Sequence, residues 1–161
     1  MTLKNVHFAA ALLATLTIAL FFSSTVFVEA FGGHPAVARV KSLIVMPGLF
    51  VLAPAIALTG GTGFVLSRGW QGALVARKKR RMPVIAGNGL LILVPAAIVL
   101  DRWAAVGVFD TSFYVLQAVE FIAGGTNLTL MGLNIRDGLR LSGRLGPRSP
   151  VQPARPSATG R

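Results

Sequence analysis

The side chains with the clearest capacity for chemistry belong to one apolar stretch, residues 111–135, and follow one spacing. They recur every four or three positions, at Glu120, Gly124, Asn127, Met131 and Asn134. At about 100° per residue these positions form one stripe on a helix. Burial favours the neutral form of a carboxyl, and a carboxyl that holds or releases a proton suits a proton relay. The simpler interpretation is a stripe that sets helix packing through hydrogen bonds.

Other polar residues could extend this stripe or supply ligands. His7 and Glu29 lie near the two ends of the first apolar stretch, and Asn88 lies between two glycines in the third. One interpretation brings His7 and Asn88 together with the two asparagines of the stripe, and Glu29 and His34 together with Glu120. The preferred interpretation is that His7 and Glu29 only mark the membrane boundary and that His34 is an ordinary loop residue.

Haem b is the sharpest cofactor hypothesis, because b-type cytochromes include small four-helix bundles. Two axial histidines must lie at one depth on different helices, whereas His7 and His34 flank one segment and would lie about 40 Å apart along a helix. A His7–Met82 or His7–Met131 pair, or His7 from two subunits, would be needed instead. We therefore predict no cofactor and no metal, and keep haem b as a third alternative.

The sequence contains no catalytic motif typical of soluble enzymes. There is no cysteine, which excludes thiolate catalysis, disulfides and Cys-ligated metals. There is also no H-E-x-x-H pattern and no paired carboxylates at a defined spacing. We expect a protein that is not an enzyme.

The elements that must position these residues are four long apolar stretches. Glu120 is the only charged side chain within residues 8–28, 43–66, 82–100 and 111–135. Each stretch is near or above the roughly 20 helical residues that cross a bilayer, and the composition is 53% hydrophobic and 13% charged. The sequence predicts an all-α integral membrane bundle in residues 1–143. Its four transmembrane helices are expected at about 8–30, 43–66, 82–102 and 111–136.

The net charge of +11 falls mainly on alternate connections, which is a topology signal. Basic residues crowd the second connection and the region after the fourth stretch, and the second connection contains Arg77, Lys78, Lys79, Arg80 and Arg81. We predict an inner-membrane protein with this loop and both termini in the cytoplasm. The run is expected to touch anionic lipid headgroups. A specific partner site is the alternative, and we expect no nucleic-acid partner.

Both ends of the chain carry further expectations. Residues 8–22 could be the core of a cleaved signal peptide, which would leave three helices. The longer uncharged stretch and the charge pattern favour an uncleaved first helix. Residues 144–161 are rich in Pro, Ser, Ala and Arg and have little to bury, so we predict a disordered tail.

Small residues line one face of the second predicted helix. Ala53, Ala57 and Gly61 follow the small-xxx-small rule, which lets helices approach closely. The expected use is tight packing inside the bundle. The alternative is a homodimer contact or docking onto a larger membrane complex.

Three segments carry a resemblance to known proteins: residues 59–64 (TGGTGF), 77–83 (RKKRRMP) and 127–138 (NLTLMGLNIRDG). With them, the chain resembles the small four-helix inner-membrane proteins of bacteria that form uncharacterised families. The resemblance covers most of residues 1–143 and implies no catalytic or binding residues.

These observations predict a multi-pass membrane protein that acts as an accessory or structural component through helix contacts. Its expected partners are the lipid bilayer and either other membrane subunits or further copies of the chain. The second interpretation is a small conduit or sensor for protons, ions or another solute, built around Glu120.

Overall fold

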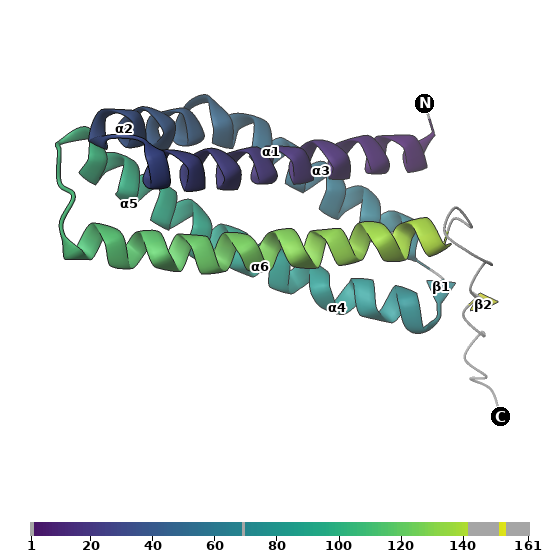
Figure 1. Cartoon of the computed structure of the whole chain (residues 1–161). Coiled ribbons are helices and arrows are strands. Elements are labelled where there is room, and N and C mark those ends of the chain that lie inside the picture. Colours follow the sequence, from purple (N-terminus) through teal and green to yellow (C-terminus); the bar gives the residue numbers. More distant parts are fainter. Residues whose placement is uncertain (1, 69, 142–151, 154–161) are drawn as a thin grey trace.

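The structure, a computed structural model, describes residues 2–68, 70–141 and 152–153, and the chain forms four long helical rods (Figure 1). The first rod is α1 (Leu3–Phe31). The second joins α2 (His34–Leu43), the irregular segment η1 (Ile44–Gly48) and α3 (Leu49–Ser67). The third joins α4 (Ala73–Asn88), η2 (Gly89–Leu93) and α5 (Val94–Ala105), and the fourth is α6 (Thr111–Leu141). Two short strands, β1 (Trp70–Gln71) and β2 (Gln152–Pro153), pair antiparallel.

Prolines explain the interruptions of the middle rods. Pro95 has no amide N–H and crowds the carbonyl one turn earlier, and the preceding residues Gly89–Leu93 widen into a π-helical turn. In the second rod, Pro47 lies within η1, where Met46 leaves helical geometry with φ −134° and ψ 114°. Pro54 and Pro83, in contrast, lie inside α3 and α4.

The start of α6 is set by a tight turn and a side-chain cap. Gly107 has a φ of 76°, which a residue without Cβ adopts without strain. Asp110 Oδ1 then accepts a hydrogen bond of 3.0 Å from the amide of Phe113. A capping side chain of this kind satisfies an amide that the first helical turn leaves free.

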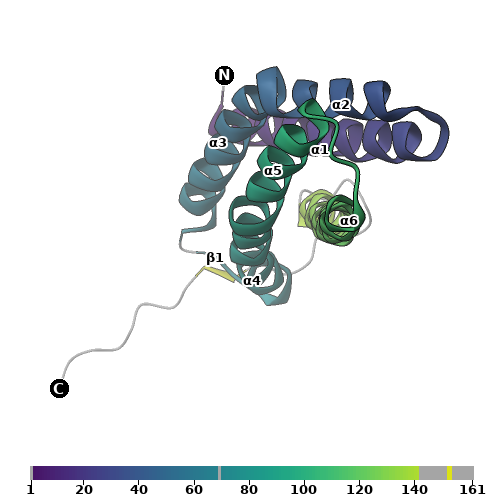
Figure 2. The same ribbon diagram turned by 90° about the vertical axis from the view of Figure 1, so that its left-hand side faces the viewer.

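The rods pack in a definite order. α1 lies mainly on α3, α2 lies on α5, and α4 lies on α6. Figure 2 views α6 nearly end-on, with α1 and α2 above it and α4 and α5 beside it. One core cluster joins α1 to α3 through Ala14, Ile18, Leu52 and Ala55. A second, around Leu100 and Phe113, joins the other end of the bundle.

The connections lie at two opposite ends (Figure 1). We name the end with the start of α1, strand β1 and the end of α6 the terminal end. The end with the α1–α2 and α5–α6 connections is named the turn end. Since the rods alternate in direction, the two termini of the helical part lie together.

Three helices are long and apolar enough to cross a membrane: Leu3–Phe31, His34–Ser67 and Ala73–Ala105. Their outward side chains suit lipid, since Phe50 and Leu91 are each more than two thirds exposed. The prediction of a helical membrane protein is confirmed at this level. α6 is not among the three, so a fourth crossing stays a prediction.

The helices extend beyond the predicted bounds at most ends. One difference concerns the basic run Arg77–Arg81, which was expected in a loop and lies within α4. The predicted disordered tail, 144–161, lies outside the described residues apart from Gln152–Pro153. An uncleaved first helix stays a prediction.

Candidate functional site

The buried polar side chains gather along α6. Among the described residues, those that are buried and polar or charged are Thr25, Lys41, Gln117, Asn127, Asn134 and Asp137. We name Gln117, Glu120, Asn127, Asn134 and Asp137 the polar seam of α6. Their spacings of three and seven keep them on one side of the helix. The seam thus runs from the turn end to the terminal end of the bundle.

At the turn end, Glu120 is ion-paired with Lys41 of α2, whose side chain is only 1% exposed. Gln117 Nε2 donates to the same carboxylate oxygen, Glu120 Oε2, at 2.9 Å. The sequence places Glu120 at membrane depth, and the structure adds a partner of opposite charge from another helix.

Sequence reasoning missed Lys41, which it assigned to a connection between helices. The structure makes this connection helical from His34, with Pro35 in the first turn. Val37, Lys41 and Ile44 then share the buried face at helical spacing. A lysine at a position otherwise held by aliphatic residues is the signal that could have revealed a buried partner.

Glu29 reaches the same region from α1. Phe22 lies edge-on to Phe121 of α6, and Thr25, one turn further along α1, is 3% exposed. Glu29 follows on this face, and its Oε1 is buried without a hydrogen-bond partner among the described residues. Lys41, Glu120 and His34 all act electrostatically on it.

His34 contributes mainly through its ring. The imidazole stacks on Phe109 with ring centres 4.0 Å apart and an interplanar angle of 9°. Phe109 in turn lies edge-on to Phe113. The stacking ties the start of α2 to the α5–α6 connection and holds His34 at the turn end.

In the middle of the seam, two asparagines join α4 to α6. Asn88 Nδ2 donates to Asn127 Oδ1 at 2.9 Å and lies 2.8 Å from the Ala123 carbonyl. Asn127 Nδ2 reaches the Ile85 carbonyl at 3.4 Å. The predicted convergence of Asn88 with Asn127 is present in this geometry, and it satisfies polar groups away from water.

At the terminal end, Arg81 turns inward to the seam. Its Nη1 is 2.8 Å from Asp137 Oδ2 and 3.5 Å from Asn134 Oδ1. Asn134 Nδ2 also lies 3.6 Å from the sulfur of Met82. The seam therefore ends in an ion pair between α4 and α6, which sequence reasoning did not predict.

Asp137 lies beyond the apolar part of α6 and is fully buried. Burial raises the pKa of its carboxyl, but the hydrogen bond and charge of Arg81 outweigh this effect, together with the charges of Arg136 and Arg77. The pKa of Asp137 is lowered as a result. The carboxylate is a fixed negative charge that several arginines surround.

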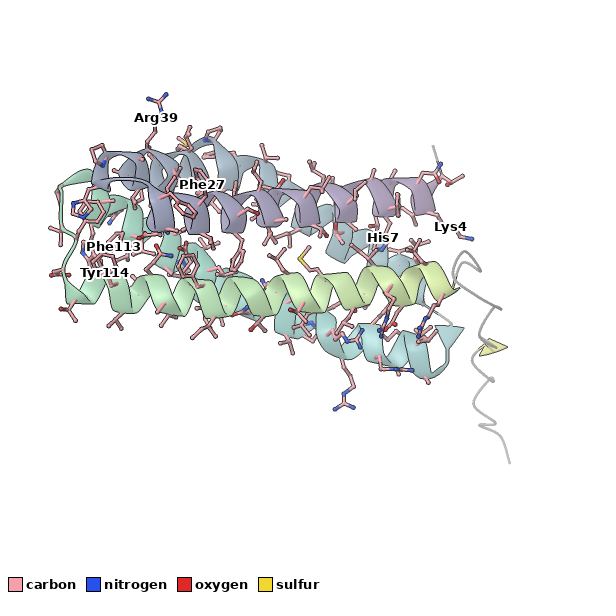
Figure 3. All side chains as sticks on the ribbon, in the orientation of Figure 1. Lys4, His7, Phe27, Arg39, Phe113 and Tyr114 are labelled. Atoms are coloured by element: carbon pink, nitrogen blue, oxygen red, sulfur yellow. The ribbon has the colours of Figure 1, made fainter. Side chains whose placement is uncertain are left out.

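His7, which one interpretation of the sequence groups with the asparagines, makes its hydrogen bond to α3. Its Nδ1 is 3.0 Å from Thr62 Oγ1 of α3. A Cβ at Gly63 would lie 3.1 Å from the imidazole, so the small residues of α3 make room for this ring. Figure 3 shows His7 near the terminal end, and the structure uses it to join α1 to α3.

Gly124, the glycine of the predicted stripe, faces an aromatic ring of α1. A Cβ at Gly124 would lie 3.1 Å from Cδ2 of Phe22. Glycine at this position therefore makes room for a side chain of α1.

The basic run of α4 divides into two groups. Arg77, Lys79 and Arg80 are exposed. Lys78 is half-buried and lies near Gly138 of α6, and Arg81 binds the seam. The exposed group is the one suited to contact with headgroups.

The three small residues that the sequence places on one face of α3 point outward. Ala53, Ala57 and Gly61 are all exposed, whereas Leu52 and Ala55 face α1. Tight packing of these three residues inside the bundle, the expected use, is therefore wrong. Large apolar neighbours border them, among them Phe50 and Phe64.

Within the described residues, no group of three or more His, Asp or Glu side chains could hold a metal ion. Comparisons of the chain with protein-family models, curated proteins and solved structures find no match.

Proposed function

We propose that the chain is a multi-pass inner-membrane protein with four crossings, formed by the rods α1, α2–α3, α4–α5 and α6. The alternating direction of the rods supports an even number of crossings. The basic residues Arg77, Lys79 and Arg80 lie at the terminal end, which supports a cytoplasmic position for that end and for both termini. The same residues are suited to anionic headgroups.

We propose further that the protein acts as an accessory or structural component and has no catalytic chemistry of its own. The observation that carries this role is the outward position of Ala53, Ala57 and Gly61 on α3. Small residues at this spacing let a second helix approach at backbone distance, and van der Waals packing and lipid release then favour association. The proposed partner is a transmembrane helix of another membrane subunit, with a second copy of this chain as the other outcome.

The interior supports the same role. Glu120 is paired with Lys41, Asn88 with Asn127, and Arg81 with Asp137. These groups are engaged with one another across helices and hold the bundle in one arrangement. A rigid bundle with a free small-residue face is suited to docking.

The test is purification in mild detergent at native expression, with mass spectrometry of co-eluting proteins and a visible absorption spectrum. Ala57→Leu and Gly61→Leu are each expected to remove a stoichiometric partner, because the larger side chain blocks close approach. Val51→Leu is the control, since Val51 is exposed on the same helix but at a different angle. A partner that is retained in all three variants, or a haem band that His7→Ala removes, would contradict the proposal.

A conduit or sensor around Glu120 is the second candidate, and the length of the polar seam favours it. Gln117 and Glu120 lie at the turn end and Asp137 at the terminal end. If the seam carries protons, Glu120→Gln should abolish proton flux into liposomes and leave expression and oligomeric state unchanged. Proton flux that Glu120→Gln does not alter would contradict the conduit, and the accessory role would be the one that remains.

A further inference from the structure

We propose that Glu29 is a proton-binding residue, in a four-residue site with Lys41, Gln117 and Glu120 at the turn end of the bundle. The ligand is a single proton taken from the water at that end. The site is separate from the outer face of α3, so its failure in a test would leave the proposed docking role untouched.

Three rods bring the site together. Glu29 comes from the last turns of α1, Lys41 from α2, and Gln117 and Glu120 from successive turns of α6. Lys41 is 1% exposed and Gln117 is 3% exposed. The site is therefore built into the contact of three helices and is more than a group of surface acids.

The hydrogen bonds of the site are unevenly shared. Lys41 Nζ and Gln117 Nε2 both donate to one oxygen, Glu120 Oε2. Two other buried oxygens, Glu29 Oε1 and Gln117 Oε1, have no hydrogen-bond partner within the described ranges. Buried acceptors without donors cost free energy, typically about 1–3 kcal/mol each. The site has more hydrogen-bond acceptors than donors, and a proton bound to a carboxylate adds a donor.

The charges of the site point to the same ligand. The site holds two carboxylates and one ammonium, that of Lys41, which is ion-paired with Glu120, so its net charge is negative while Glu29 is ionised. A proton on Glu29 makes the site neutral. His34 of α2, stacked on Phe109, also acts electrostatically on Glu29, and α5, which packs on α2, carries Asp101 and Arg102.

A metal ion fits this site less well than a proton. Hard cations such as Ca²⁺ take about six to eight oxygen ligands, and the site offers only two carboxylates and one amide. The ammonium of Lys41 is also bound to one of those carboxylates. Since a proton needs one oxygen, Glu29 Oε1 alone is enough to hold it.

Glu29 and Glu120 are the only two glutamates of the chain, which permits a sharp experiment. The full-length protein is labelled with ¹³C-carboxyl glutamate, reconstituted in nanodiscs, and titrated from about pH 4 to about pH 9 by infrared spectroscopy. The isotope shift separates the glutamate carboxyl band from those of the aspartates. We expect one labelled protonated-carboxyl band per chain, which disappears as the pH rises.

The matched variants assign the band. Glu29→Gln should remove it, whereas Glu120→Gln should retain one labelled carboxyl. Glu29→Asp keeps a carboxyl at the site but carries no label, so it should also remove the labelled band and serves if the glutamine variant does not fold.

Three outcomes would overturn the proposal. The first is a labelled band that persists in both Glu29 variants, which would assign the proton to Glu120. The second is the absence of a labelled protonated-carboxyl band at every pH of the titration. The third is a shift of the titration midpoint when Na⁺ replaces choline at constant ionic strength, which would assign the site to a metal cation.

Discussion

Lys41 is the residue on which the turn end depends. Its ammonium is almost completely buried and meets Glu120 across the α2–α6 contact. Taking two charges out of water is expensive, and their attraction with good hydrogen bonds offsets much of this cost. Removing one partner leaves the other charge buried and unpaired. The loss of one partner therefore costs more free energy than the intact pair contributes to stability.

Lys41→Met should therefore lower the free energy of unfolding by about 3–5 kcal/mol. Thermal unfolding in detergent measures the effect. Lys41→Met combined with Glu120→Leu should recover most of the loss, because no lone charge remains. Arg39→Met is the control, since Arg39 projects away from the bundle (Figure 3). An equal loss in the control would contradict the role of the pair.

Asp137 gives the terminal end a dependence on pH. Because the pKa of Asp137 is lowered in the folded protein, its contribution is complete above the ordinary aspartate pKa of about 3.9 and is lost as the pH falls through the folded value. Thermal unfolding from neutral to acidic pH should show this loss. Asp137→Asn should reduce the loss of stability at acidic pH and lower stability at neutral pH. Asp101→Asn is the control and should retain the loss of stability at acidic pH.

At the scale of elements, the contact of α1 with α6 depends on the space above Gly124. Gly124→Leu should push Phe22 aside and cost about 1–3 kcal/mol by overpacking. Combining it with Phe22→Ala should restore part of the loss. Gly132→Leu is the matched control on the same helix, because a Cβ there meets nothing within 4 Å. Unfolding in detergent with urea would compare the four variants.

The element scale also shows what the sequence could and could not predict. Uncharged length predicted the helices well, because a run without charge and with many aliphatic residues has few alternatives in lipid. The spacing of Glu120, Asn127 and Asn134 correctly grouped them on one face of α6. Partners on other helices were harder to predict, since Lys41 and Arg81 lie beyond the uncharged runs and were assigned to connections.

The direction of a small-residue face was not available from the sequence either. Ala53, Ala57 and Gly61 share a face at helical spacing, but so do Leu52 and Ala55 on the roughly opposite side of the helix. Both faces are apolar, so hydropathy does not distinguish the lipid side from the core side. The structure resolves this by placing α1 on Leu52 and Ala55.

At the scale of the whole molecule, the proposed topology predicts which connections are reached from outside the cell. The chain has no cysteine, so Val106→Cys and Ser67→Cys each introduce a single thiol. A membrane-impermeant thiol reagent should label Val106→Cys in intact cells and Ser67→Cys only after permeabilisation. The reverse pattern would place the terminal end outside.

The polar seam has a consequence for the order in which the chain enters the membrane. α6 is synthesised after the other three rods, and it is absent from the three helices of the described residues that are apolar enough to cross by length and composition. Its carboxylate and amides meet Lys41 and Asn88 on rods synthesised earlier. If α6 is the fourth crossing, its insertion is therefore coupled to assembly. The first three rods are apolar enough to insert independently, whereas contacts with side chains of those rods favour the insertion of α6.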